Sequence, residues 1–78
     1  MSEVYNFVKD LLVKNLNIDE AKISMEAVIT DDLGADSLDV MDLVGMIEKQ
    51  YSITIPQEDY AKLKTVGDVV NYVASKQS

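Results

Sequence analysis

The residue best suited to covalent chemistry is Ser37, which lies in the run Asp31-Asp32-Leu33-Gly34-Ala35-Asp36-Ser37-Leu38-Asp39. This run predicts a turn that leads into a helix. Gly34 allows a tight or left-handed backbone, and either Asp36 or Ser37 can cap the first helical turn. A serine there lies at the positive end of the helix dipole, which favours a phosphate ester on its hydroxyl. The plainer interpretation is that Ser37 is only a capping hydroxyl.

The usual catalytic residue types are missing from the chain. Its 78 residues contain no Cys and no His. This excludes disulfides, thiol nucleophiles, zinc sites built on Cys, and catalytic arrangements that need a His. The loop pattern of a calcium-binding EF-hand, tested from Asp31, fails at Leu33, Ala35 and Asp36, so we expect no metal site. The sequence therefore predicts a protein that enzymes act on or bind, and not an enzyme.

The negative charge is concentrated around Ser37. The chain has 14 acidic residues and 7 lysines, and its formal net charge is −7. Seven of the acids lie between Glu26 and Glu48, a segment without any lysine. This balance argues against nucleic acid as a partner, because nucleic-acid binding depends on cations that neutralise phosphates. A run of charge usually marks a solvated face, but its confinement to one segment favours a surface that basic partners recognise.

The spacing of apolar residues predicts one all-α domain over residues 1–78, a small four-helix bundle. We expect a first helix at about 3–15 with Ser2 as its N-cap, and a second at about 37–51. The loop between them is long, and its apolar residues suggest that it is pinned to the core. Residues 52–55 are expected to form an extended connector to a short third helix at about 57–63. Thr65-Val66-Gly67-Asp68 matches a capping box that begins the last helix.

The second helix is predicted to have two different faces. The helical period of 100° per residue places one group of side chains on the core side: Val40, Leu43, Val44, Ile47 and Tyr51. The opposite side exposes acids interleaved with apolar residues: Leu38, Asp42, Gly45 and Lys49, flanked by Asp39, Met41, Met46 and Glu48. The last helix has a core stripe of its own: Val66, Val69, Val70 and Val73.

Neither a membrane span nor an export signal is predicted. No apolar run approaches roughly 18 residues, the length that a spanning helix needs. The first ten residues lack the basic and apolar regions of a signal peptide. We expect a cytoplasmic protein, although a processed organellar form would look the same.

Three motifs in order make the sequence similar to the acyl carrier protein family. The first is Asp32-Leu33-Gly34-Ala35-Asp36-Ser37-Leu38-Asp39, which resembles the phosphopantetheine site at the start of the family's second helix. The second is Ile55-Pro56, which follows the aromatic Tyr51, and the third is the run from Thr65 to Asp68. The resemblance covers nearly the whole chain. The form around Ser37 looks like the free-standing carrier of type II fatty acid synthesis.

The resemblance implies a cofactor and a mechanism. A phosphopantetheinyl transferase would use coenzyme A and Mg²⁺ to place 4′-phosphopantetheine on Ser37, beside Asp36. The cofactor would supply the thiol that this chain lacks, and acyl chains would travel on it as thioesters between enzymes of fatty acid biosynthesis. The carrier is expected to act as a monomer.

The resemblance also implies two surfaces. Basic docking patches on the partner enzymes would meet acidic and apolar residues of the second helix: Asp36, Leu38, Asp39, Met41, Asp42 and Glu48. An acyl pocket inside the bundle would be lined by a second set: Leu43, Val44, Ile47, Ile55, Tyr60 and Leu63. In the plainer interpretation, the second set is simply core.

Two alternatives to a carrier of fatty acid synthesis stay open, a carrier for another pathway and a protein that is not a carrier. The chain differs from the family's usual pattern at Thr30, at Gly45 and at Glu48-Lys49-Gln50, which suggests an altered choice of partner. An accessory carrier for polyketide, lipid-modifying or amino-acyl pathways is therefore one alternative. The other is an acidic helical adaptor that binds a basic partner and has no prosthetic group.

Overall fold

The computed structural model describes residues 3–77, and every regular element in that range is helical. The α-helices are α1 (Glu3–Leu16), α2 (Ser37–Tyr51) and α3 (Val66–Gln77), and two 3₁₀-helices lie between them, η1 (Glu20–Lys22) and η2 (Gln57–Lys62). The predicted all-α bundle is confirmed, and so are the bounds of the second helix. Ser2, the expected N-cap of the first helix, lies outside the described residues.

The three α-helices bury the apolar stripes that the sequence predicts. Val8 and Leu12 of α1 have no exposed surface, and α1 packs against both α2 and α3. The α2 helix buries Leu43, Val44 and Ile47, whereas Val40 and Tyr51 are half-buried at the edge of the core. All four valines of the predicted α3 stripe are buried. Each fully buried side chain of this size contributes roughly 1.5–3 kcal/mol to folding, so these stripes are the main source of stability.

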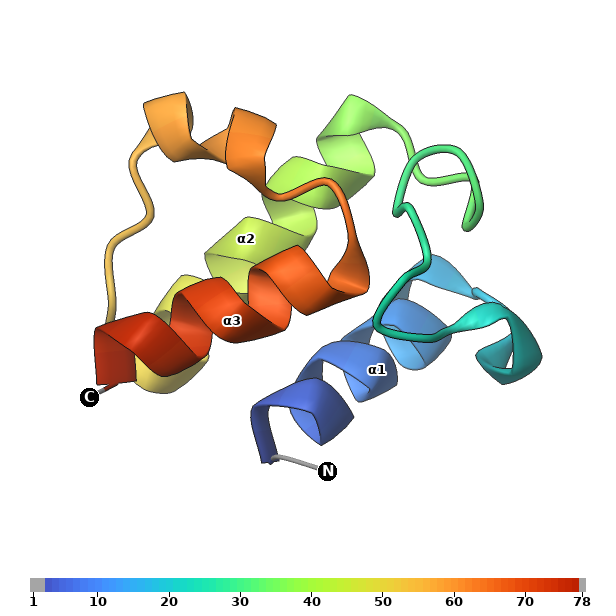
Figure 1. Ribbon diagram of the computed structural model, residues 1–78, viewed down its shortest axis with the longest axis horizontal. Coiled ribbons are helices and arrows are strands. Elements are labelled where there is room, and N and C mark those ends of the chain that lie inside the picture. Colours follow the sequence, from blue (N-terminus) through green and yellow to red (C-terminus); the bar gives the residue numbers. More distant parts are fainter. Residues whose placement is uncertain (1–2, 78) are drawn as a thin grey trace.

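The long loop between α1 and α2 is fastened to the bundle, as the sequence predicts. Its residues Ile18, Ile23, Ile29 and Leu33 are buried in the common core. It also runs antiparallel to the segment that leads into α3, and a β-bridge pairs Val28 with Thr65. Figure 1 shows the loop beside the start of α3. Backbone pairing and buried side chains explain how so long an irregular segment is tolerated.

The third helix of the predicted bundle is a 3₁₀-helix in place of an α-helix. Pro56 precedes it without a side-chain cap, and none of its six residues is buried. The buried residues lie on either side of it, Ile55 before and Leu63 after. Because η2 has no buried stripe of its own, its position depends on the buried residues that flank it and on side-chain hydrogen bonds to the rest of the fold. The predicted connector at residues 52–55 begins with Ser52, which is left-handed with φ of 54°, and residues 53–55 then form neither helix nor strand.

The first turn of α3 confirms the predicted capping box. Thr65 Oγ1 accepts a hydrogen bond from the Asp68 N–H over 3.0 Å, and the Asp68 carboxylate accepts one from the Thr65 N–H over 3.0 Å. Within residues 3–77, no helix is both long enough and apolar enough to cross a membrane.

Candidate functional site

Ser37 is the first residue of α2, and the cap belongs to its neighbour. Asp36 is the N-cap, and its carboxylate accepts the Asp39 N–H over 2.9 Å. Asp39 completes the capping box by accepting the Asp36 N–H over 3.2 Å. Both residues were compatible with capping at the level of sequence, and the structure selects Asp36. The Ser37 side chain is exposed and, within the described residues, its hydroxyl has no hydrogen-bond partner. The hydroxyl is therefore available for reaction.

The loop that precedes Ser37 is held in place by backbone hydrogen bonds. Gly34 is left-handed with φ of 73°, the conformation that its place in the turn predicts. Its N–H donates to the Thr30 carbonyl over 3.1 Å, and the Ala35 N–H donates to the Ile29 carbonyl over 3.2 Å. Asp32 closes the turn by accepting the Val28 N–H over 2.8 Å. The position of Ser37 is thus determined by the fold and not by a free loop.

Ser37 lies on the wall of an open cavity of about 640 Å³. The lining is mainly apolar and comes from three separate parts of the chain: Val28, Thr30 and Asp31 of the loop; Ser37, Val40 and Met41 of α2; and Gln57, Tyr60, Ala61, Leu63 and Lys64 of η2 and the turn after it. An exposed hydroxyl beside such a cavity can carry a group whose apolar end is sheltered from water.

Only two of the predicted pocket residues line this cavity. Tyr60 and Leu63 do, whereas four others are buried behind its wall: Leu43, Val44, Ile47 and Ile55. Leu43, Val44 and Ile47 form the buried stripe of α2, and Ile55 joins them in the common core from the segment after this helix. Sequence reasoning missed the loop residues of the wall, since nothing local indicates that residues 28–31 lie against η2. Two signals were available: Val40 was predicted to face inward, and the apolar residues of the loop, which include Val28, were predicted to be pinned to the core.

The predicted partner face divides into exposed residues and residues engaged in the fold. Leu38 and Met41 are 68% and 49% exposed, and Asp42 is exposed without a hydrogen-bond or ion-pair partner in the described part of the chain. Asp39 is half-buried in the capping box. Glu48 is also half-buried, and its carboxylate accepts the Ile55 N–H over 2.7 Å. The docking roles of these residues stay predictions. In the structure, Asp39 and Glu48 also stabilise the fold, because their carboxylates accept backbone N–H groups.

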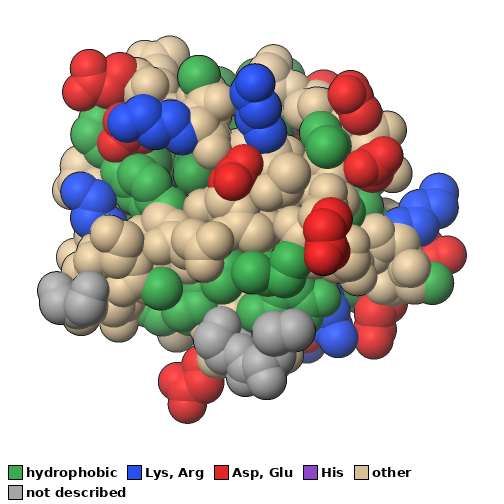
Figure 2. Space-filling view, in the orientation of Figure 1, with side chains coloured by type: hydrophobic (Ala, Val, Ile, Leu, Met, Phe, Trp, Pro, Cys, Tyr) green, Lys and Arg blue, Asp and Glu red, His purple; other side chains and the backbone are tan. Residues whose placement is uncertain are grey.

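Acidic side chains do not form a continuous negative patch on the face shown in Figure 2. On the face shown in Figure 2, acidic, basic and apolar side chains are interspersed. A partner that meets this face would therefore meet charges of both signs. Within residues 3–77, no group of three or more His, Cys, Asp or Glu side chains is placed to hold a metal ion.

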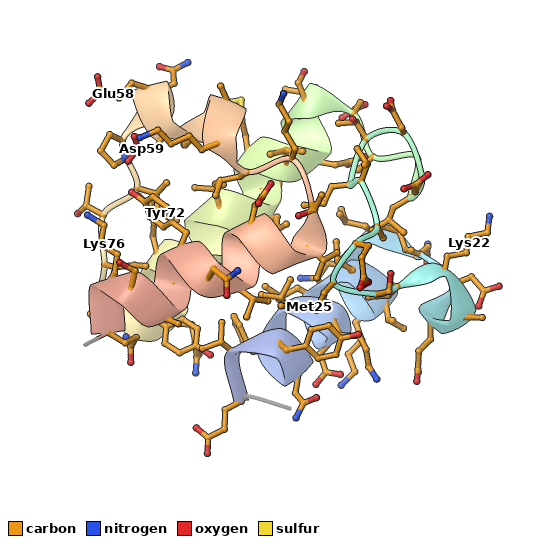
Figure 3. All side chains as sticks on the ribbon, viewed as in Figure 1. Lys22, Met25, Glu58, Asp59, Tyr72 and Lys76 are labelled. Carbon is orange, nitrogen blue, oxygen red and sulfur yellow. The ribbon has the colours of Figure 1, made fainter. Side chains whose placement is uncertain are left out.

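One side-chain hydrogen bond ties η2 to α3. The Tyr72 hydroxyl donates to Oδ2 of Asp59 over 2.6 Å, and Figure 3 shows the two residues at the same end of the molecule. This bond lowers the pKa of Asp59 and is the main cause that raises the pKa of Tyr72 to about 12. Because η2 supplies Gln57, Tyr60 and Ala61 to the cavity, the bond holds one wall of the site.

Comparison with known proteins gives concordant matches. Residues 6–73 match the family described as "Phosphopantetheine attachment site". The chain is 49% identical over 69 residues to a protein named "Acyl carrier protein" from Bdellovibrio bacteriovorus, a match that covers 88% of each chain. It is also 46% identical over 70 residues to a protein of the same name from Clostridium acetobutylicum, and this match covers 90% of the present chain and 91% of its relative.

Proposed function

The chain belongs to the acyl carrier protein family, and on that premise we propose that Ser37 is the residue to which its 4′-phosphopantetheine is attached. Members of the family are carriers and not catalysts, and the phosphopantetheine group is their cofactor. The observation that carries the assignment is the Ser37 side chain, which is exposed, unpartnered among the described residues and placed on the cavity wall.

The residues around Ser37 fit the group. Asp36 and Asp39 cap α2, so the serine hydroxyl can be esterified without loss of the helix start. In the transfer, Ser37 Oγ would bond to the phosphorus next to the pantetheine of coenzyme A. The pyrophosphate bond would break, adenosine 3′,5′-bisphosphate would leave, and a base of the transferase would take the hydroxyl proton. The chain needs no base of its own. When bound, the group supplies the thiol on which acyl chains are held as thioesters.

We further propose that the protein shuttles growing acyl chains between enzymes of fatty acid biosynthesis. The outward face of α2 supports this role: Leu38 and Met41 are exposed apolar contacts, and Asp42 is an exposed acid. Acids of this kind steer encounter with basic partner surfaces more than they raise affinity, which suits a carrier that must leave each enzyme. Asp36, Asp39 and Glu48 belong to the same proposed face.

The cavity beside Ser37 is the proposed shelter for the acyl chain. Tyr60 and Leu63 line it directly, and the four core residues Leu43, Val44, Ile47 and Ile55 would be reached by a chain that enters more deeply. The whole chain is proposed to act as one carrier domain and as a monomer. The two relatives are bacterial proteins, which supports the cytoplasm as its proposed location.

Intact mass spectrometry tests the attachment site. Incubation with coenzyme A, Mg²⁺ and a phosphopantetheinyl transferase should add about 340 Da, one phosphopantetheine. Ser37→Ala should gain no mass, whereas Ser24→Ala, which changes another exposed serine, should gain it as the parent does. Loading of Ser37→Ala would overturn the assignment. Malonyl transfer to the holo-protein, compared with amino-acid adenylation assays, then separates fatty acid synthesis from an amino-acyl pathway.

A further inference from the structure

The cavity that begins at Ser37 also has a cation on its wall. Among the described residues that line it, Lys64 is the one that carries positive charge, and Asp31 is the one acid. The Lys64 side chain is exposed, and the two ion pairs within residues 3–77 use Lys9 and Lys62. Lys64 is therefore available to an anion that enters this space.

Backbone hydrogen bonds determine where the Lys64 side chain starts. Its carbonyl accepts the Ile29 N–H over 2.9 Å, and its own N–H donates to the Asp68 carboxylate over 3.1 Å. The carbonyl of Ile29 in turn accepts the Ala35 N–H. Ile29 thus lies between the segment that carries Lys64 and the segment that leads into Ser37. Both segments are therefore hydrogen-bonded to the backbone of the same residue, and both Lys64 and Ser37 line the cavity.

An anion attached to Ser37 would meet the positive end of the helix dipole and the first-turn N–H groups of Ser37 and Leu38, but no side-chain cation in the first turns of α2. The capping box already uses the backbone N–H groups of Asp36 and Asp39 on carboxylates, and these two acids would repel the newcomer. The α2 helix has one lysine, Lys49, which lies twelve residues beyond Ser37 and therefore roughly 18 Å along the axis. A side-chain cation for a phosphate there must therefore come from another element, and lysine binds phosphate as a point charge.

We propose that the Lys64 ammonium binds an anion carried on Ser37, and so positions the prosthetic arm along the cavity. The inference rests on the proposed attachment at Ser37. Two sources could supply the anion: the phosphodiester of the arm itself, or a terminal carboxylate on a dicarboxylic cargo. Lys64 is a positioning residue in this account, since it reaches no reacting atom. The pairing is exposed to solvent, so it is sensitive to salt.

The experiment compares three variants in four forms of the protein. Lys64→Gln removes the cation, and Lys64→Arg retains it. Lys62→Gln makes the same charge change at a lysine that pairs with Asp59 over 3.4 Å and does not line the cavity. Each variant is prepared as the apo-protein, the holo-protein, and the butyryl and succinyl forms loaded from the matching acyl-coenzyme A. The melting temperature and the ³¹P resonance of the arm are measured at low and at high salt.

The expected result is specific to Lys64. In Lys64→Gln, the gain in melting temperature from apo to loaded protein should fall by about 2–4 °C at low salt, with a shifted ³¹P resonance, and Lys64→Arg should restore both. An equal loss in all loaded forms assigns the anion to the phosphodiester, and a loss confined to the succinyl form assigns it to the cargo. Unchanged values in every form, or an equal loss in Lys62→Gln, would overturn the proposal. Failure of the attachment at Ser37 is seen earlier and separately, as the absence of the mass gain.

Discussion

The hydroxyl of Tyr72 lies 2.6 Å from Oδ2 of Asp59, and this hydrogen bond joins α3 to the 3₁₀-helix that forms one wall of the cavity. Both side chains are titratable, and each shifts the pKa of the other. Asp59 also pairs with Lys62, and the Lys76 ammonium lies 5.5 Å from the centroid of the Tyr72 ring. Since η2 has no buried residue of its own, the contact is a main determinant of how firmly the wall is held.

The pH dependence of stability should reveal this contact. The hydrogen bond lowers the pKa of Asp59 below 3.8, so its contribution is present above pH 3.8 and is lost as the pH falls through the folded pKa. It raises the pKa of Tyr72 from 10.0 to about 12, so the contribution is present below pH 10 and is lost as the pH rises through 12. Tyr72→Phe should therefore lower the melting temperature by a constant amount between about pH 5 and 9.

Thermal melts of wild type and Tyr72→Phe over a series of pH values test this prediction at both the acidic and the alkaline end. The difference between wild type and Tyr72→Phe should shrink below pH 4 and again above pH 10. Lys62→Gln is the control, because it removes an exposed ion pair from the same carboxylate and should change little. A difference that stays constant from pH 3 to pH 12 would show that the lost stability comes from packing and not from the hydrogen bond.

Two glycines should respond to alanine in opposite directions. A Cβ on Gly67 would lie 2.9 Å from the carbonyl oxygen of Met25, the same oxygen that accepts the Gly67 N–H over 2.8 Å. Figure 3 labels Met25 near the start of α3. Gly67→Ala must therefore displace the loop backbone, and we expect a loss of about 1–3 kcal/mol in the free energy of unfolding.

Gly45 is the matched control on α2, since a Cβ there would meet nothing within 4 Å. Gly45→Ala should raise the free energy of unfolding by about 0.5–1 kcal/mol, because alanine loses less backbone entropy in a helix. Urea denaturation at neutral pH measures both. Equal and small changes in the two variants would mean that the loop moves freely away from α3, contrary to the hydrogen-bonded geometry.

These loop contacts also mark where prediction from the sequence ends. Helix bounds and buried faces follow from local periodicity and capping, which is why Ser37–Tyr51 and the Thr65–Asp68 box were predicted correctly. The pairing of Val28 with Thr65 joins residues far apart in the chain, and no local pattern encodes it. The cavity depends on that pairing, because it brings the loop against the turn after η2.

The acidic residues around Ser37 are a second case in which the sequence predicts only part of the structure. Composition identified an acidic segment around Ser37, but it could not distinguish carboxylates that hold the backbone from carboxylates that are free. Asp32, Asp36, Asp39 and Glu48 each accept a backbone N–H, whereas Asp42 accepts none. Hydrogen bonds of this kind join residues three to seven positions apart and depend on the final fold. On the proposed partner face of α2, the structure thus narrows the test of recognition to Asp42.

Reversal of the charge at Asp42 should slow docking without harm to the helix. Asp42→Lys is expected to reduce the rate of association with a basic partner, such as the transferase, on the order of tenfold at low salt, and much less at high salt. Asp39→Lys is a poorer test, because it also removes half of the capping box. The measurement is the rate of loading at limiting carrier concentration, with circular dichroism to verify the fold.

The control for this charge reversal is Asp10→Lys, which makes the same change at an exposed acid of α1. It should load nearly as fast as wild type. If both variants are slowed equally, net charge and not the face of α2 governs encounter, and the proposed docking role of Asp42 fails. If neither is slowed, electrostatic steering contributes nothing measurable.

Tyr60 should limit the length of the acyl chain that the cavity shelters. Its half-buried side chain lines the cavity together with residues of α2. Each methylene that a chain buries contributes about 0.8 kcal/mol, so the melting temperature of acyl-loaded protein should rise with chain length until the cavity is full. Tyr60→Ala enlarges the space and should move this plateau to longer chains, while Tyr60→Phe keeps the ring and should leave it in place. The measurement is a melting series on protein loaded with saturated chains of increasing length, alongside the rate at which hydroxylamine cleaves each thioester. A plateau at the same length in all three proteins would mean that the chain lies outside the cavity or passes Tyr60 on another route.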